Sequence, residues 1–211
     1  MENAKTLNIS RNAYREAIQV LTAKGLVESR PKTGTRVLPR SQWNLLDPMV
    51  LQWAFSGEPD VGYVRDVFEL RLMVEPHAAR LAAERRDRHD IAAMKDAFAR
   101  MRRFTLATDE GREADRDFHS ALLGATRNSV LVTLSASVGA AVNWTTQFKQ
   151  RSRGLPRDPL PDHGRVLDAI VAGDPAAAAR AMEALVQLAL EDTRMAMDLP
   201  EPALDAINVN P

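Results

Sequence analysis

Polar residues occupy core-facing positions in two amphipathic stretches of the chain, and they are the first candidates for chemistry. Counted in steps of three and four along EADRDFHSALL, one stripe contains Asp115, Phe118, His119 and Leu122. A second stripe contains His163, Val166, Leu167 and Ile170. A buried charge or imidazole is costly unless it is paired or bound to a metal. The pattern therefore predicts that these polar side chains meet in one cavity.

The spacing of the aspartate and the first histidine suits the binding of a cation. Asp115 and His119 lie four residues apart, which places an oxygen and a nitrogen donor about one helical turn apart. With His163 as a third donor they would form a facial set, and carboxylate with imidazole suits Zn, Ni, Mn or Fe. A simpler alternative stays open, in which Asp115 and His119 form an ordinary ion pair and His163 is exposed at a helix start.

Two further residues are candidates for holding a ligand beside this set. Arg71 shares a stripe with Val67 and Val74, so its guanidinium group faces the core and offers two parallel donors to a carboxylate. Asn143 lies in the middle of an expected helix and could bond hydroxyl groups of the same ligand. Arg71 and Asn143 are therefore predicted to bind an effector.

The composition is that of a globular protein without redox chemistry at sulfur. The 211 residues are 45% hydrophobic and 27% charged, which allows one sizeable core or a medium domain with a small one. The absence of cysteine excludes disulfides, thiolate zinc sites and cysteine nucleophiles. No segment resembles a signal peptide, and no apolar run reaches the roughly 18 to 20 residues of a membrane span. We therefore expect a cytoplasmic protein that does not contact membranes.

A basic head precedes an acidic body. Residues 1–41 contain eight Lys or Arg and three Glu, although the charges of the whole chain cancel. Ser10 is a predicted N-cap for the helix RNAYREAIQVLTAK, and the runs LVES and TRVL predict a hairpin whose tip contains Gly34. A helix with Arg11, Asn12 and Arg15 on its polar face, followed by a basic hairpin, is typical of a winged helix-turn-helix on DNA. The alternative is a solvated basic face.

The remaining chain has a helical pattern to its end. The expected helices span residues 48–56, 60–85, 88–104, 109–125, 128–150, 161–172 and 175–197. Pro76 should kink or divide the second of them. The predicted fold is mainly α: a partial winged helix-turn-helix followed by an all-α bundle of six to seven antiparallel helices. The predicted divisions are 1–41 for the DNA-binding head, 42–58 for the linker and first helix, 59–198 for the effector-binding bundle and 199–211 for a disordered tail.

The head resembles a known DNA-binding domain. ISRNAYREAIQVLTAKGLVESRPKTGTRVLP is similar to the second half of that domain in GntR-family bacterial transcription regulators, with a Ser-Arg helix start, an Arg-Glu-Ala motif and a Gly-tipped wing. This resemblance implies that Arg11, Arg15 and Gly34 contact operator DNA. The family's domain begins with another helix, for which the sequence before the motif has no room. The first helix is therefore expected to be missing from this head.

The body resembles the FadR-type ligand-binding domain, called FCD, of the same family. ADRDFHSALLGATRN is similar to its D-x-x-x-H-x-x-L helix, and DHGRVLDAIVAGDPAAAARAM is similar to its later histidine segment. The resemblance implies that Asp115, His119 and His163 bind a divalent metal ion (Zn, Ni or Mn) and that Arg71, in ELRLMVEP, faces the ligand. Leu185 stands where the family usually has a fourth ligand, a histidine.

The segment that joins head and body narrows the expected effector. RSQWNLLDPMVLQWAF resembles the linker of sugar-acid regulators in this family, which implies a small aldonate-like carboxylate as effector. We expect a homodimeric regulator, most simply a repressor, that binds operator DNA and has no catalytic residues. Two alternatives stay open: a metal-dependent enzyme acting on a sugar acid, and a ligand-binding or dimerisation remnant that does not bind DNA.

Overall fold

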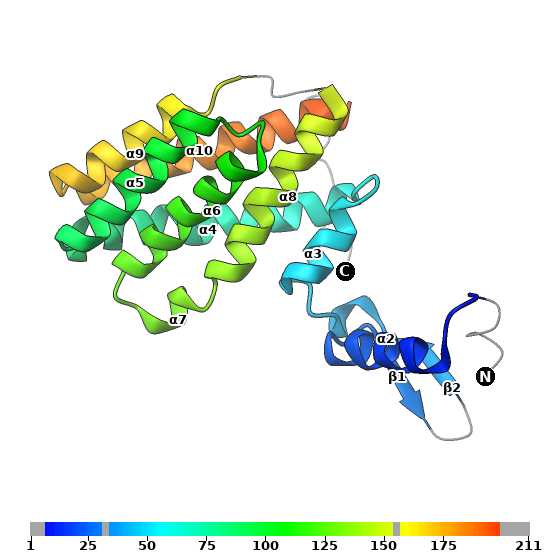
Figure 1. Ribbon diagram of the computed structural model, residues 1–211. Helices are drawn as coiled ribbons and strands as arrows, with labels where there is room; N and C mark the ends of the chain where they lie inside the picture. Colours follow the sequence, from blue (N-terminus) through cyan, green and yellow to red (C-terminus); the bar gives the residue numbers. More distant parts are fainter. Residues whose placement is uncertain (1–6, 31–33, 154–156, 199–211) are drawn as a thin grey trace, which may run out of the picture. The chain divides into compact units, whose positions relative to one another are not determined.

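The computed structural model describes residues 7–30, 34–153 and 157–198 and is mainly helical (Figure 1). The chain divides into two compact units, Met1–Val50 and Leu51–Pro211. The division falls inside the segment that the sequence assigns to the linker and first helix. The expected tail, residues 199–211, lies outside the described residues.

The described part of the first unit contains helix α2 and a two-stranded sheet. Its elements are α2 (Arg11–Ala23), β1 (Val27–Arg30), β2 (Gly34–Val37) and the 3-10 turn η1 (Arg40–Gln42). The side chain of Ser10 caps α2 by accepting a hydrogen bond from the backbone N–H of Ala13. The strands pair antiparallel, with Val27 opposite Val37 and Arg30 opposite Gly34. The helix-and-hairpin prediction is therefore confirmed.

A glycine allows the close turn between α2 and β1. Gly25 has a φ of +70°, and a Cβ atom built there would lie 2.3 Å from the backbone oxygen of Gln42. Beside this turn, Nζ of Lys24 lies 2.7 Å from Oδ1 of Asp47. The same oxygen accepts hydrogen bonds from the backbone at the start of the next helix, α3 (Pro48–Phe55), including Met49 N–H.

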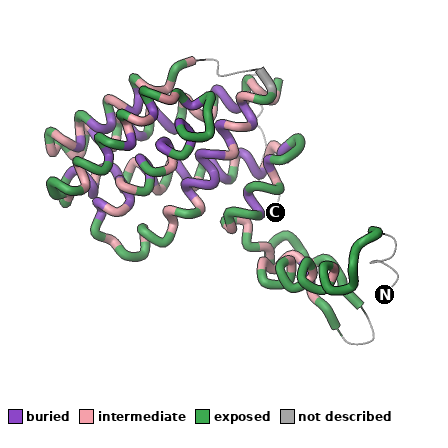
Figure 2. The backbone as a smooth tube through the Cα atoms, viewed as in Figure 1, coloured by how far each residue is buried: buried purple, intermediate pink, exposed green. Residues whose placement is uncertain are grey.

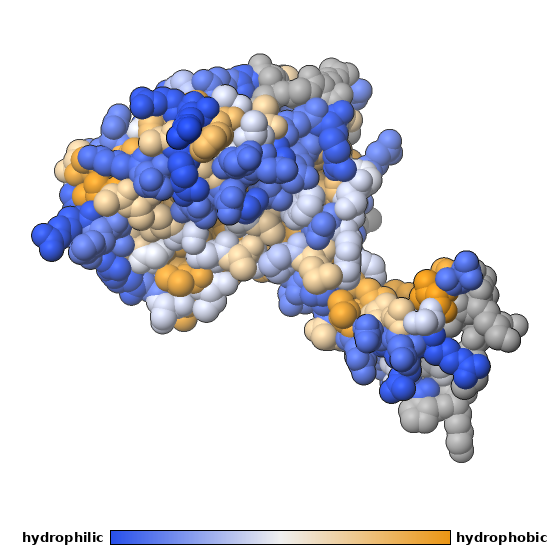
Figure 3. Space-filling model, viewed as in Figure 1, coloured by the Kyte–Doolittle hydropathy of each residue, from blue (hydrophilic) through white to orange (hydrophobic). Residues whose placement is uncertain are grey.

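The head exposes much of its apolar surface. No residue of α2 is buried, and the exposed large apolar side chains of this unit include Leu7, Ile9, Val20 and Val37. Hydrophobic patches are visible on this unit in Figure 3. The described part of the head is therefore held together by its turn, its hairpin and a small contact between α2 and β1.

The second unit is a bundle of helices joined by short connections. After α3 come α4 (Val61–Arg85), α5 (Arg88–Phe104), α6 (Asp109–Ala125), α7 (Ser129–Val132), α8 (Ser135–Arg153), α9 (Leu160–Ala172) and α10 (Pro175–Ala196). Helix α4 packs against α10 and α6, α5 packs against α6, and α10 also packs against α9. Short connections between long helices favour antiparallel neighbours, and Figure 1 shows this arrangement. No described helix has the length and apolarity to cross a membrane.

Buried residues recur along the helices of the bundle and alternate with exposed ones (Figure 2). The largest fully buried side chains include Phe68, Met94, Phe118, Ile170 and Met182. The helices that supply them start at polar caps, as the sequence predicts. The carboxylates of Asp87 and Asp174 accept backbone hydrogen bonds at the starts of α5 and α10. These caps fix where each helix begins and therefore which of its residues face the core.

One of the two alternatives for Pro76 is ruled out, and one helix prediction needs correction. Pro76 does not divide α4, which runs continuously from Val61 to Arg85. Proline removes only one backbone hydrogen bond there, and packing along α10 outweighs that loss. The helix expected at 128–150 is instead two helices, α7 and α8. The chain tightens between them because the backbone and hydroxyl of Thr133 both donate to the carbonyl of Val130, three residues earlier.

Candidate metal and effector site

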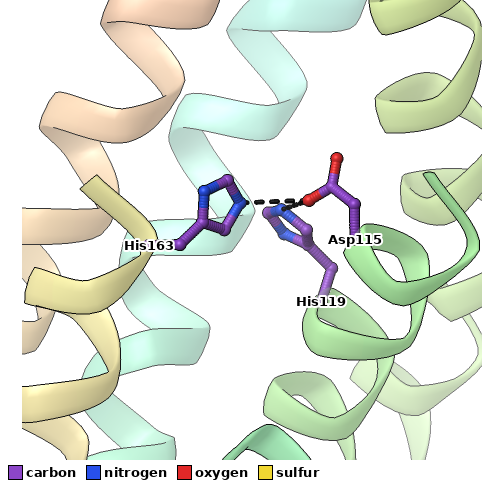
Figure 4. Close-up of side chains that lie close together, drawn as sticks. All are labelled: Asp115, His119 and His163. Carbon is purple, nitrogen blue, oxygen red and sulfur yellow. Dashed lines mark ion pairs between the residues drawn. The ribbon is translucent and has the colours of Figure 1, made fainter. Parts of the chain in front are cut away.

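The predicted donors meet inside the bundle. Asp115 and His119 come from α6 and His163 comes from the start of α9, and all are buried (Figure 4). Oδ1 of Asp115 lies 3.0 Å from Nε2 of His163 and 3.6 Å from Nε2 of His119. One ligand atom from each residue falls within 4.8 Å of the others. The structure therefore places these side chains together, and His163 is not exposed.

The donor set fits a metal ion. Two ligand atoms about 2.1 Å from a shared ion are about 3.0 Å apart at right angles and about 3.4 Å apart at the tetrahedral angle. The observed separations from Asp115 are close to these values. Although Oδ1 of Asp115 and Nε2 of His163 are near each other, neither makes a well-aligned hydrogen bond to another described residue. Buried polar atoms that converge without bonding each other are what a cation-binding centre requires.

Neighbouring groups orient both imidazole rings. Nδ1 of His163 lies 2.9 Å from the carbonyl oxygen of Pro159, so its N–H donates there and Nε2 is left for a ligand. Nδ1 of His119 lies 2.7 Å from Oε2 of Glu75, within ion-pair distance. In both rings Nδ1 is therefore engaged on the far side, and Nε2 faces Asp115.

The charges of the donors stabilise each other. Burial alone would raise the pKa of Asp115 and lower that of His163. Contact between the carboxylate and the imidazole outweighs burial, so the pKa of Asp115 is lowered and that of His163 is raised. Because a bound metal ion needs the unprotonated Nε2 of His163, metal affinity should fall at acid pH.

A buried ion pair holds Arg71 beside the donors. Nε of Arg71 donates to Oε1 of Glu75 at 2.6 Å, one helical turn away on α4. Burial opposes the charge on Glu75, but the charges of Arg71 and His119 lower its pKa to about 2. Glu75 is therefore a carboxylate that contacts both the arginine and a donor histidine. This contact fixes Arg71 at the cavity wall through Nε and leaves its terminal amino groups for a ligand.

One cavity unites these groups. It is lined by Arg71, Leu106, Asp115, His119, Val142, Thr145, Thr146, Lys149, Arg157, Pro159, His163, Leu185, Ala189 and Asp192. The volume of this cavity is about 30 Å³, roughly twice what one ordered water needs. In this conformation the cavity has room for an ion with a water, and a larger ligand requires lining side chains to move.

The other predicted site residues lie as follows. Leu185 lines the cavity and is buried, so an apolar side chain stands where the family's fourth ligand would be. Asn143 does not line the cavity, and its Oδ1 accepts from Arg116 at 3.0 Å. In the head, Arg11, Asn12 and Arg15 are exposed on α2, and Gly34 begins β2. Asn143 is therefore not one of the cavity-lining residues, and its role in effector binding stays a prediction.

Sequence reasoning missed other charged residues of the site. Glu75 follows Arg71 by four residues, so their shared stripe could have revealed it. Lys149 follows Val142 and Thr145 at helical spacing, and Asp192 follows Leu185 by seven residues. These positions carry a periodic signal, but only the tertiary contacts show that α4, α8 and α10 face one cavity.

The fold and site define a ligand-sensing transcription regulator. Residues 66–188, more than half of the chain, match the family model of the FCD domain. The galactonate operon transcriptional repressor of Escherichia coli K12 is 35% identical over 189 residues, which cover 88% of this chain and 81% of the relative. The chain therefore belongs to the FadR-type, FCD-containing branch of the GntR family. It is a transcription regulator rather than an enzyme, as its family and relatives are.

Other relatives and solved structures agree. The regulator LutR of Bacillus subtilis is 29% identical over 184 residues, with 85% of this chain and 82% of LutR covered. Lar, which controls the agr system of Listeria monocytogenes, has a TM-score of 0.67 at 16% identity, covering 91% and 83% of the two chains. Streptococcus agalactiae GntR has a TM-score of 0.54 at 24% identity, covering 90% and 86%. The structural neighbours support the fold alone.

Proposed function

We propose that this protein is a metal-assisted, effector-responsive repressor of sugar-acid catabolism that acts in the cytoplasm as a homodimer on operator DNA. The observation that carries the proposal is a buried cavity that contains Arg71 together with Asp115, His119 and His163. The galactonate operon repressor of Escherichia coli and the Uxu operon regulator of Haemophilus influenzae are among its relatives. They support an aldonate-like effector, with D-galactonate as the first compound to test.

The cavity residues bind the effector by charge and by coordination. Arg71 has its Nε held by Glu75, so its terminal amino groups remain for a carboxylate. Asp115, His119 and His163 would hold a divalent metal ion (Zn, Ni or Mn), which supplies a positive charge and open positions for carboxylate or hydroxyl oxygens. Because Leu185 cannot coordinate, the effector has access to a position that a protein ligand would otherwise take.

Effector binding must change the shape of the bundle. An aldonate is larger than the space in the cavity, so lining helices or side chains have to move apart to admit it. A ligand shifts a conformational equilibrium only by its differential affinity for the two states. The opened conformation would thus be the one with lower affinity for the operator, which couples effector binding to DNA release.

The head supplies the DNA contacts. Arg11, Asn12 and Arg15 are exposed on α2, which we propose enters the major groove. The wing that contains Gly34 would contact the phosphate backbone or the minor groove. A homodimer would present two such heads to a two-fold symmetric operator.

Thermal unfolding tests the effector site. D-galactonate with Zn²⁺, Ni²⁺ or Mn²⁺ should raise the melting temperature of the full chain above the value with metal or galactonate alone. Arg71→Ala should lose the galactonate shift and keep the metal shift, whereas His163→Ala should lose the metal shift. A normal galactonate titration by Arg71→Ala would contradict the assignment, and turnover of galactonate would contradict the regulator mechanism.

Gel-shift assays at several salt concentrations test the DNA function. This chain and a version extended at its N-terminus should be compared on the DNA upstream of the genes around its own. Specific binding that galactonate and metal release would support a repressor. If neither version binds DNA while galactonate still binds, the protein is a ligand-binding remnant instead.

A further inference from the structure

Lys149 is the least compensated charged group of the cavity. It lies on α8, lines the cavity and is 6% exposed. Within the described part of the chain, no hydrogen bond or ion pair joins its ammonium group to another residue. The other two cations of the cavity wall do have partners: Arg71 contacts Glu75, and Arg157 contacts Asp162. Lys149 therefore differs from both in having no partner of its own.

The charged neighbours of Lys149 come from every helix around it. Burial lowers its pKa to about 8; Asp192 on α10 and Asp115 on α6 oppose this shift, whereas Arg71 on α4 and Arg157 before α9 add to it. The two acids also face other cations, since Asp115 contacts His163 and Oδ2 of Asp192 lies 3.1 Å from Nε of Arg157. Lys149 therefore shares the acids that stabilise its charge with other cations of the cavity.

A second unused donor lies at the same cavity. Nη2 of Arg157 is buried and has no hydrogen-bond partner among the described residues. Thr146, one turn before Lys149 on α8, is buried and also lines the cavity. A buried donor without an acceptor is costly, so the Arg157 side of the cavity is arranged for a ligand that accepts hydrogen bonds.

We propose that Lys149 is a direct binding residue for the anionic group of the effector, contacting it from α8 while Arg71 contacts it from α4. This inference rests on the proposed function, since it assigns a further residue to the same effector site. It also narrows the class of ligand. An anion would pair with the positive charge of Lys149, whereas a neutral polyol of the same length would leave that charge without a counter-charge.

A structural role for Lys149 would have the opposite signature. If its ammonium group held the bundle together, replacing it would destabilise the ligand-free protein. A lysine that serves a ligand instead destabilises the ligand-free protein, because its side chain is largely buried and its charge has no ion-pair partner among the described residues. Lys149→Met keeps much of the side-chain volume and removes the charge. It should therefore raise or preserve the melting temperature of the ligand-free protein and weaken anion binding.

The experiment compares the full chain with Lys149→Met, Lys149→Arg and the control Lys95→Met, which changes an exposed lysine on α5. Calorimetric titration with D-galactonate in the presence of Zn²⁺ should show affinity weakened by about tenfold or more in Lys149→Met. Lys149→Arg should recover part of the loss, and Lys95→Met should bind as the parent does. A parallel titration with Zn²⁺ alone should show no loss of metal affinity in Lys149→Met.

Inorganic phosphate separates the failure of this inference from the failure of the proposed function. If galactonate does not bind the parent but phosphate protects the parent and not Lys149→Met, the anion contact stands and the proposed effector is wrong. If Lys149→Met binds galactonate as tightly as the parent, the inference is overturned and the proposed function stands. A ligand-free Lys149→Met that unfolds well below the parent would also overturn it, in favour of a structural lysine.

Discussion

Replacing Glu75 by glutamine should destabilise the bundle by roughly 3 kcal/mol at neutral pH. The side chain is 1% exposed and its pKa is about 2, compared with an ordinary value of 4.5. At 1.36 kcal/mol per tenfold change in proton affinity, this difference corresponds to roughly 3 kcal/mol of interaction that only the carboxylate makes. Glutamine keeps the shape of the side chain but leaves Arg71 buried without its counter-charge.

The pKa shift of Glu75 also predicts how the effect of Glu75→Gln on stability changes with pH. The pKa of Glu75 is lower in the folded state than in the unfolded state, so its contribution is complete above about pH 4.5. It is lost as the pH falls from about 4.5 towards 2. The gap in unfolding free energy between the parent and Glu75→Gln should therefore be widest near pH 7 and shrink as the solution is acidified.

Urea unfolding at pH 7, 5 and 4, followed by circular dichroism with a chelator present, measures this gap without bound metal. Glu69→Gln is a matched control, since Glu69 is on the same helix but exposed and 3.6 Å from Arg65. It should change stability by less than about 0.5 kcal/mol. Equal stability of the parent and Glu75→Gln at pH 7 would refute the reasoning that a charged Glu75 compensates Arg71.

Two further predictions concern the frame around the site. A Cβ atom at Gly111 would lie 1.7 Å from the backbone oxygen of Thr105, so Gly111→Ala should destabilise by on the order of 3 kcal/mol in urea unfolding. Gly124→Ala on the same helix meets nothing within 4 Å and should be neutral or stabilising; equal effects would contradict the clash. Arg151 donates a hydrogen bond to the carbonyl of Phe55 at the end of α3. Because Arg151 is exposed, Arg151→Ala should lower the free energy of unfolding by only about 1 kcal/mol. The same variant should speed amide hydrogen exchange in α3. Unchanged exchange would count against this contact.

The helices and the donor triad could be predicted because both depend on local periodicity. Ser10, Asp87 and Asp174 are caps whose effect is confined to one turn, so their positions mark helix starts. Asp115 and His119 share a face of α6 because a helix has 3.6 residues per turn, whatever surrounds it. The prediction failed at the division of α7 from α8, where a local side-chain hydrogen bond overrode the pattern.

The sequence by itself determined that the donor triad and Arg71 lie on core-facing stripes, since such stripes are a property of each helix alone. Only the tertiary structure decided which of those stripes face one another. Glu75 and Lys149 are ordinary charged residues in the sequence, and Asn143 looks as good a ligand contact as either. Packing of α4, α6, α8, α9 and α10 around one cavity gives Glu75 two partners and turns Asn143 to Arg116. The same packing leaves Lys149 without a partner among the residues that the structure describes. Electrostatic energy depends on distances between helices, which no single helix encodes.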